Sequence, residues 1–233
     1  MPSRQKRGEL LARPDPDELL SAGADKLGVP LGPEQVLAFR AYREEILRWA
    51  GHMSLTALTR PEEIVRHGFL DALACLPLIP LGARRALDIG SGAGFPAIPI
   101  AIIRSSLDFT LIEVSRKKIS FLRHVVRLLA LSRVRPVLGR AEKIVEHDPE
   151  MAASFDFASA RAVAPLAKIG GVVFPFLRPG GVFLAQVGSG RETDAALADL
   201  IGMGFELVGE IAVPAWIGAP SHEILTLRKG LGG

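Results

Sequence analysis

The stretch ALDIGSGAGFPAIPIAII, residues 86–103, decides the fold of this 233-residue chain. It reads as an apolar strand with an acid near its end, a loop with glycines at positions 90, 92 and 94, and an apolar helix. Glycine permits positive φ angles and the close approach of a ligand to the backbone, and the free amides at the start of a helix favour an anionic group. We therefore expect a ligand at the carboxyl end of this strand.

Short apolar runs alternate with helical patterns after this stretch, which is typical of a mostly parallel sheet covered by helices on both faces. The last two predicted strands have no helical pattern between them and predict a hairpin whose terminal strand is antiparallel. The predicted strands cover residues 85–89, 109–114, 135–138, 155–158, 182–187, 205–213 and 222–227. The predicted helices cover residues 97–104, 116–131, 165–177 and 192–203.

Apolar residues also recur at helical spacing before the sheet begins. Residues 16–84 are expected to form a helical N-terminal extension, and residues 85–233 the domain that contains the sheet. Residues 1–15 are expected to be a mobile basic tail, with cations at Arg4, Lys6, Arg7 and Arg13.

Composition excludes several classes of protein. No apolar run reaches the roughly 18 to 20 residues of a membrane helix, and the basic start lacks the apolar core of a secretion signal, so we expect a cytoplasmic location. The single cysteine, Cys75, excludes a disulfide within the chain and thiolate metal clusters. We expect Cys75 to be a core residue and the site to contain no metal.

The spacing of the glycines narrows the choice of ligand. A dinucleotide-binding loop has the pattern G-x-G-x-x-G, but Phe95 occupies the position of its third glycine. The pattern is instead G-x-G-x-G with an acid two residues ahead, as in enzymes that use S-adenosylmethionine. The residues predicted to form the donor site are Asp88, Gly90, Gly92, Gly94 and Phe95.

The ends of the next two strands supply further groups for the same ligand. Glu113 lies 23 residues after Gly90 and can accept hydrogen bonds from both hydroxyls of a ribose. Ala141 and Glu142 follow the third strand and can flank an adenine. The alternative for Glu113 is an exposed acid at a strand end, but three strand ends with groups for methionine, ribose and base favour S-adenosylmethionine as the cofactor.

Some acceptor chemistries lack the residues they need. Methylation of pyrimidine C5 requires a cysteine nucleophile, and Cys75 lies in the helical segment. Methylation of exocyclic amines commonly uses an acid or amide, two prolines and an aromatic at the fourth strand, where this chain reads ASARAVAPL. A ring nitrogen such as guanine N7 has a free lone pair, so alignment beside a cation suffices. Arg161 is the candidate cation, and a structural salt bridge to Asp156 or Glu113 is its alternative role.

A basic block follows the second strand. Residues 116–143 contain nine Lys or Arg and one acid, Glu142. Such a block is either a solvated helix face or an anion-binding surface that neutralises RNA phosphates. Apolar residues at helical spacing should face the sheet, which leaves Arg123 and Arg127 on one exposed edge. The predicted RNA-binding residues are Arg116, Lys117, Lys118, Arg123 and Arg127.

Four motifs make the chain resemble a known family. LDIGSGAGFPAIPIAI, TLIEVSRKKISFLRHV, LGRAEKI and FDFASARAVAPL are similar to the bacterial 16S ribosomal RNA guanine-N7 methyltransferases, also called glucose-inhibited division protein B, over about residues 35–228. The resemblance implies a class I methyltransferase fold with a mostly parallel seven-stranded sheet, S-adenosylmethionine as donor, and a guanine of 16S ribosomal RNA or of the small subunit as acceptor. By position it puts Gly90 and Phe95 in the donor pocket, Ala141 and Glu142 beside the adenine, and Arg161 between donor and acceptor.

The departures from the family fall in the acceptor half. Ser54 replaces the asparagine of an Asn-Leu-Thr motif, and Val187 replaces a lysine at the end of the fifth strand. The family's His-x-x-Asp pair becomes RHGFLD, so Gly68 takes the histidine position unless a one-residue shift brings His67 there. The Ser-Arg-Ala triplet becomes SARA, read as an insertion of Ala160. A methyltransferase of a small molecule or protein, and a binding protein without turnover, therefore stay open as alternatives. We expect a monomer.

Overall fold

The computed structural model describes residues 14–161, 165–188, 191–217 and 222–231. Seven strands form one sheet in the order β3-β2-β1-β4-β5-β7-β6, and only β7 runs against its neighbours, because it pairs antiparallel with both β5 and β6. This is the predicted class I methyltransferase sheet with its terminal antiparallel hairpin. The strands are β1 Arg85–Ile89, β2 Asp108–Glu113, β3 Val134–Leu138, β4 Phe155–Arg161, β5 Leu177–Gly188, β6 Phe205–Ala212 and β7 His222–Lys229.

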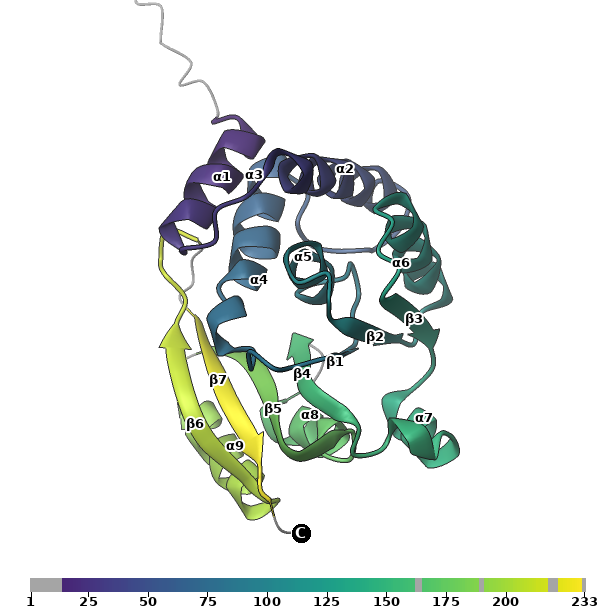
Figure 1. Ribbon diagram of the computed structural model, residues 1–233, viewed down its shortest axis with the longest axis vertical. Coiled ribbons are helices and arrows are strands. Elements are labelled where there is room, and N and C mark those ends of the chain that lie inside the picture. Colours follow the sequence, from purple (N-terminus) through teal and green to yellow (C-terminus); the bar gives the residue numbers. More distant parts are fainter. Residues whose placement is uncertain (1–13, 162–164, 189–190, 218–221, 232–233) are drawn as a thin grey trace, which may run out of the picture.

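Helices cover both faces of the sheet (Figure 1). One face carries α1 Pro16–Lys26, α2 Pro33–Ala50, α4 Asp71–Leu73, α5 Ala97–Ile103 and α6 Arg116–Leu128. The other carries α7 Ala141–His147, α8 Leu166–Val173 and α9 Arg191–Gly202. Shorter helical segments are α3 Pro61–Glu63, the π-helix Ile64–Leu70, and 3-10 turns at Leu76–Leu78 and Pro149–Met151.

The alternation of side chains along the strands builds two hydrophobic clusters. Ala86 and Leu111 belong to the cluster under α2, α5 and α6, whereas their neighbours Leu87 and Ile112 belong to the cluster under α8 and α9. Residues two apart on a strand share a face. The face of the first cluster therefore also receives three polar side chains from β1 and β4: Asp88, Ser159 and Arg161.

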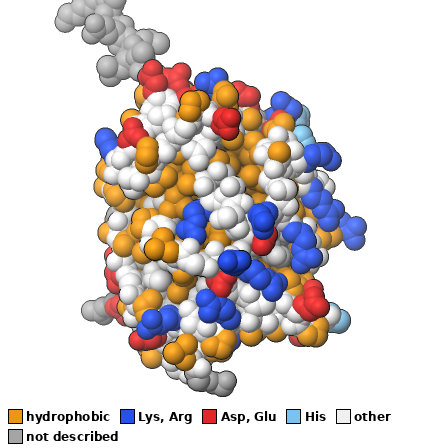
Figure 2. Space-filling view, in the orientation of Figure 1, with side chains coloured by type: hydrophobic (Ala, Val, Ile, Leu, Met, Phe, Trp, Pro, Cys, Tyr) orange, Lys and Arg blue, Asp and Glu red, His pale blue; other side chains and the backbone are white. Residues whose placement is uncertain are grey.

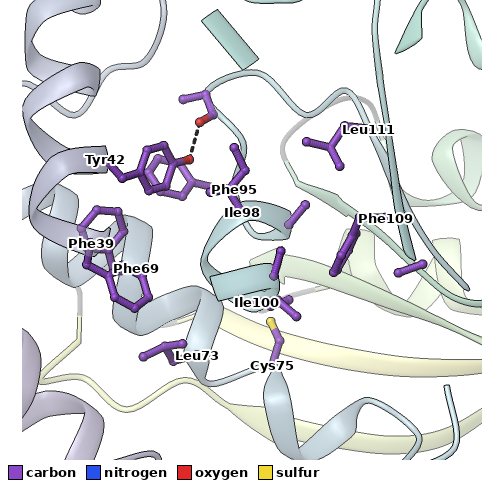
Figure 3. Close-up of a cluster of buried hydrophobic side chains, with 14 of the residues drawn as sticks. Phe39, Tyr42, Phe69, Leu73, Cys75, Phe95, Ile98, Ile100, Phe109 and Leu111 are labelled. Carbon is purple, nitrogen blue, oxygen red and sulfur yellow. Dashed lines mark hydrogen bonds between the residues drawn. The ribbon is translucent and has the colours of Figure 1, made fainter. Parts of the chain in front are cut away.

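The N-terminal extension is part of the first cluster. Phe39 and Tyr42 on α2 are fully buried, and both rings pack on Phe69, with centroids 4.9 Å and 5.4 Å away respectively. Figure 3 shows these rings on one side of Ile98 on α5, and Phe109 and Leu111 on β2 on its other side. The predicted basic tail lies outside the described residues except for positions 14 and 15. Within the described chain, every helix is too short or too polar to cross a bilayer.

Two predicted helices are too long at their C-terminal ends. Residue 130 is an alanine with φ of 50°, and this left-handed residue ends α6 at Leu128 instead of 131. The segment 165–177 is split, because α8 ends at Val173 and β5 begins at Leu177. Pro175 lacks the N–H that a continuing helix would need.

Close packing of α8 on α9 predicts opposite effects for two adjacent glycines. A Cβ at Gly170 would lie 2.0 Å from Cδ2 of the buried Leu200, so Gly170→Ala should lower the free energy of unfolding by about 1–3 kcal/mol. A Cβ at Gly171 would come no closer than 3.9 Å to Met203, so the control Gly171→Ala should be neutral or raise it by up to about 1 kcal/mol. Urea unfolding measures both. Equal effects would contradict the close contact.

Candidate active site

The glycine loop follows β1 and is fixed from two sides. The amides of Gly90 and Ser91 donate to the carbonyl of Ile112 at 2.8 Å and 3.2 Å. On the other side, the hydroxyl of Tyr42 donates to the carbonyl of Ala93 (Figure 3). Burial raises the pKa of Tyr42 well above its usual value, so the phenol keeps the proton that it donates. The N-terminal extension thus holds the loop in place.

Two of the loop glycines have different tasks. Gly94 has φ of 95°, and a Cβ there would lie 2.7 Å from both Tyr42 Oη and Ile98 Cδ1, so packing requires the glycine. Gly92 has φ of 56°, and a Cβ there would meet only the Gly90 carbonyl at 3.7 Å. The space in front of Gly92 is therefore open to a ligand.

Glu113 connects this loop to the next helix. Its Oε2 accepts from the amide of Gly92 at 2.9 Å, and its Oε1 accepts from the amide of Ser115, the N-cap of α6, at 2.8 Å. The residue is 5% exposed but lines the cleft, so it is not the exposed strand-end acid of the alternative prediction. Each carboxylate oxygen keeps a second lone pair for a hydroxyl donor.

The cleft consists of two hollows that share Gly90 and Val114. The larger, of about 470 Å³, is lined by the glycine loop, Glu113, Lys118, Arg161 and the segment 55–58. The smaller, of about 230 Å³, is lined by Ala141 and Glu142 at the start of α7 and by Lys168, Ile169 and Val172 on α8. Val114 is apolar yet 61% exposed, so a ligand would cover it here.

The structure brings most of the predicted donor residues to this cleft. The lining residues among them are Gly90, Gly92, Phe95, Glu113, Ala141 and Glu142. Asp88 and Gly94 lie behind the loop instead. Sequence reasoning missed Val114 and the three residues of α8, because the exposure of Val114 and the place of α8 beside it are set by the tertiary structure.

Asp88 is a buried carboxyl rather than a cleft residue. Its Oδ1 accepts from the hydroxyl of Ser159 at 2.7 Å, while its Oδ2 has no hydrogen-bond partner among the described residues. Burial raises the pKa of Asp88 to about 7, and the nearby Glu113 carboxylate adds to the rise. Asp88 therefore changes charge near neutral pH.

Arg161 is the last residue of β4, and its partner is neither Asp156 nor Glu113. Its Nη1 lies 2.9 Å from Oδ2 of Asp71, which is 1% exposed at the start of α4, and its guanidinium lies 5.9 Å from the Phe95 ring centroid. Asp156 instead pairs with Arg178 and accepts from the amides of Arg84 and Arg85. The predicted alternative partners of Arg161 were wrong, because α4 supplies an acid 90 positions away in the chain.

Two further polar side chains meet the same carboxylate. Nε2 of His222 on β7 lies 2.7 Å from Asp71 Oδ1, and the amide of Gln186 on β5 donates to Oδ2 at 3.3 Å. Asp71 therefore joins α4 to three strands. The adjacent Cys75 is buried as expected, and burial raises the pKa of its thiol.

The basic residues lie along α6, beside the larger hollow. Arg116, Lys117, Arg123 and Arg127 are exposed, Lys118 is half-buried in the cleft lining, and none of the five forms an ion pair with another described residue. Phe121, Leu122 and Val125 are buried against the sheet. Figure 2 shows Lys and Arg side chains gathered along the edge formed by α6.

Comparison with known proteins decides the family. The model of the family GidB, rRNA small subunit methyltransferase G, matches residues 35–201. The chain belongs to the GidB family. Ribosomal RNA small subunit methyltransferase G of Deinococcus deserti is 40% identical over 178 residues, which cover 75% of this chain and 71% of that protein. The protein of the same name from Geobacter sp. (strain M21) is 36% identical over 201 residues, which cover 84% and 91%.

Solved structures show the same fold at low identity. The cyclase SpnF superposes with a TM-score of 0.59 and 19% identity over 87% of this chain and 98% of that chain. Aeropyrum pernix fibrillarin, solved with natively bound S-adenosyl-L-methionine, gives a TM-score of 0.51 and 19% identity over 62% and 66%. Because one of these is a cyclase, the fold alone does not fix the reaction.

The cleft fits S-adenosylmethionine, the methyl donor of methyltransferases with this fold. Gly92 leaves space in the cleft that a side chain at this position would fill. Glu113 has lone pairs for two ribose hydroxyls, and Val114 has an exposed apolar surface that a ligand can cover. The smaller hollow, which Ala141 and Glu142 line, has apolar walls for a base. Glu113 and Gly92 would therefore hold the middle of the donor, and the smaller hollow its adenine.

Gly68, at the position where the family resemblance expects a histidine, lies within a π-helix. A Cβ at Gly68 would lie 2.6 Å from the Phe95 ring, so no side chain fits at this position. Residues 64–70 form a π-helix, which takes an extra residue into its turn. Burial lowers the pKa of His67, the Asp71 carboxylate opposes that shift, and Arg161 adds to it, so His67 lies within the field of both. His67, one position before Gly68, is therefore the histidine of this segment that lies near the Asp71–Arg161 pair.

The other departures from the family have simpler structural outcomes. The ladder of β4 with β5 runs without a register shift through Ser159, Ala160 and Arg161, and the ladder with β1 does so through Ala160. Ala160 is therefore an ordinary strand residue rather than a bulge. Val187 packs on the edge of the second hydrophobic cluster. Leu55 and Thr56 of the former Asn-Leu-Thr motif line the larger hollow, whereas Ser54 lies outside its lining.

The buried Asp88 predicts a pH-dependent stability. Its folded-state pKa of about 7 exceeds the ordinary value of 3.8, so its contribution is complete below about pH 4 and is lost as the pH rises to about 7. Between pH 4 and 8 the free energy of unfolding of the wild type should fall by about 2–4 kcal/mol relative to Asp88→Asn. Urea unfolding at each pH measures this difference. The exposed control Asp199→Asn should differ from the wild type by the same free energy of unfolding at every pH. A wild-type-minus-variant difference that does not change with pH for Asp88→Asn would contradict the raised pKa.

The two hydrogen bonds of Glu113 predict a donor-binding defect. Glu113→Ala should weaken S-adenosylmethionine binding by about 1–3 kcal/mol in titration calorimetry, because the ribose loses an ionic acceptor and the loop loses its anchor at Gly92. Glu113→Gln keeps the shape and one acceptor, so its loss should be smaller. Wild-type affinity in Glu113→Ala would contradict this role. Heat from NADH but none from S-adenosylmethionine in the wild type would contradict the identity of the ligand.

Proposed function

We propose that this GidB-family enzyme transfers a methyl group from S-adenosylmethionine to N7 of a guanine in 16S ribosomal RNA. The observation that carries the proposal is the position of Arg161, which faces the larger hollow at the end of β4 with its guanidinium held by the buried Asp71. The names of the relatives support ribosomal RNA as the substrate, and the free cations of α6 beside the same hollow suit a polyanion. With such a substrate, we expect the enzyme in the cytoplasm.

Guanine N7 suits a site whose residues align rather than deprotonate. When bound, S-adenosylmethionine supplies a methyl group on a sulfonium, which is electrophilic without further activation. N7 carries a lone pair and no proton, so the guanine attacks without a general base. The residues of this chain then need to hold the base in line and exclude water, which lowers the entropic part of the barrier.

Arg161 has donors left for that task. A guanidinium presents five N–H groups in a rigid fork, and the Asp71 carboxylate uses only one edge of it. The remaining donors can bind the O6 atom of the guanine or a phosphate oxygen, which leaves N7 free to react. Phe95, below the guanidinium, keeps the group from turning away. We assign Arg161 the catalytic role and Asp71 a positioning role.

Labelled methyl transfer tests the proposed function. Total RNA from a strain that lacks the gene should accept methyl groups, and nucleoside mass analysis should find 7-methylguanosine in the 16S fraction. The rate at saturating substrates should stay flat from about pH 6 to 9, measured also in Asp88→Asn because Asp88 titrates near pH 7. Incorporation into a different nucleoside, a protein or a small molecule would identify another acceptor and contradict the proposal.

Arg161 separates alignment from donor binding. Arg161→Ala should lower the methyl-transfer rate by at least about 10²-fold, because alignment of the reacting pair is lost, while S-adenosylmethionine affinity stays within a few fold. Arg161→Lys should recover little, since one ammonium cannot replace a planar fork.

Arg178 is a matched control for Arg161. It pairs with Asp156 at the opposite end of β4 and β5, so Arg178→Ala removes an Arg–Asp ion pair without touching the cleft and should keep the wild-type rate. Quenched single-turnover assays measure the methyl-transfer rate of Arg161→Ala, Arg161→Lys and Arg178→Ala. An equal loss of methyl-transfer rate in Arg161→Ala and Arg178→Ala would show that Arg161 has only a structural role.

A further inference from the structure

A hollow separate from the donor cleft lies between the end of α2 and the first turns of α6. Its volume is about 460 Å³, and its lining residues are Arg48, Trp49, His52, Met53, Lys117 and Ser120. We call it the Trp49 hollow. The donor-binding residues and the Asp71–Arg161 pair do not line it, so the proposed reaction leaves its purpose open.

Trp49 is fixed from behind. Its indole N–H donates to Oε2 of Glu45 at 3.2 Å, and its ring meets the edge of the buried Phe121, with centroids 5.6 Å apart and planes at 69°. The side chain is half-buried and its remaining surface faces the hollow. A ring held in this way loses little conformational entropy when a second flat group stacks on it.

The rim of the hollow is cationic. The Arg48 side chain is 66% exposed even though it pairs with Glu45, and Lys117 is exposed and has no ion-pair partner in the described part of the chain. Among the residues that the structure describes, no carboxylate lines the hollow. Glu45, one helical turn before Trp49, is 4% exposed, pairs with Arg48, and has its Oε2 2.9 Å from Nε2 of His124.

An aromatic wall beside exposed cations matches one class of ligand. The base of an unpaired nucleotide stacks on tryptophan, and its phosphate binds Lys or Arg. A phosphate alone would leave the apolar wall uncovered, and an apolar peptide would leave the cations unused.

The Trp49 hollow and the donor cleft are neighbours. Lys117 lines the hollow and Lys118 lines the cleft, and consecutive Cα atoms lie only about 3.8 Å apart. The segment after α2 also lines both, because Met53 lines the hollow and Leu55, two residues later, lines the cleft. The two linings thus adjoin at α6 and after α2, an arrangement that would let one strand place neighbouring nucleotides in the cleft and at Trp49.

We infer that the Trp49 hollow binds the base of an unpaired nucleotide that flanks the methylated guanine in the RNA substrate. This inference rests on the proposed function, because it takes the acceptor to be RNA. Trp49 stacks on the base, while Arg48 and Lys117 bind the adjoining phosphates. The site selects a guanine whose neighbour is unpaired, since a base inside a duplex cannot reach the tryptophan.

Fluorescence tests the stacking directly. The chain has two tryptophans, so Trp216→Phe leaves Trp49 as the single tryptophan, which is excited selectively at wavelengths that tyrosine does not absorb. An unpaired guanine-containing RNA oligonucleotide should quench its emission, and the same oligonucleotide in a duplex should quench much less at equal phosphate concentration. Unchanged emission at RNA concentrations that saturate binding by anisotropy would overturn the inference. A response to ribosomal protein with none to RNA would do the same.

Kinetics tests the contribution to substrate binding. Trp49→Leu should raise the KM for RNA about 5- to 150-fold, the range for loss of one stacked base, whereas Trp49→Phe should stay within about threefold of wild type. Both should keep wild-type S-adenosylmethionine affinity. Arg228→Ala is the charge control for Lys117→Ala, because Arg228 pairs with Glu206 at the far end of β7. Lys117→Ala should raise the KM for RNA, and Arg228→Ala should not.

The two proposals can fail separately. If the wild type transfers no methyl group to RNA, the proposed function fails. If the wild type methylates RNA but Trp49→Leu and Lys117→Ala keep the wild-type KM, only the Trp49 hollow is wrong. Should Trp49→Leu fold poorly, as a melting curve would reveal, Lys117→Ala and the fluorescence of Trp49 decide the question.

Discussion

The carboxylate of Asp71 is the group on which the acceptor side of this protein depends. It is 1% exposed, it comes from the N-terminal extension, and it meets side chains from β4, β5 and β7. Removing one partner of a buried ion pair costs about 3–5 kcal/mol, because the other charge is left uncompensated. The sheet end and the extension are thereby tied together at the point where Arg161 must be held still. The conformation of Arg161 is thus decided by a residue outside the sheet.

The donor side depends on the extension in the same way. Tyr42 on α2 donates to the carbonyl of Ala93, and Glu113 on β2 accepts from the amide of Gly92, so the glycine loop is held between a helix and a strand. The loop needs both contacts because its glycines by themselves permit many conformations. The extension therefore contributes to the donor site and to the acceptor site while packing in one hydrophobic cluster with the sheet.

Strand parity explains why the polar side chains of the site collect on one face. Asp88 on β1 and Ser159 and Arg161 on β4 all point toward the extension, and Gln186 on β5 and His222 on β7 follow the same alternation. The opposite face stays apolar under α8 and α9. A shift of one residue in β4 would turn Arg161 away from Asp71, so the unbroken ladder through Ala160 is a condition for the site.

Local patterns in the sequence determined the order of the elements, the glycine loop and the strand-end positions of Glu113 and Ala141. These features follow from short-range rules, since a parallel sheet gathers its strand ends at one edge. Only the tertiary structure decided the partner of Arg161, the π-helix that carries His67 and the contacts that hold Trp49. Asp71 and Arg161 are 90 positions apart, and Trp49 meets Phe121 only because α2 lies across α6. The residue types favour many such pairs equally, and the packing of the extension on the sheet selects one of them.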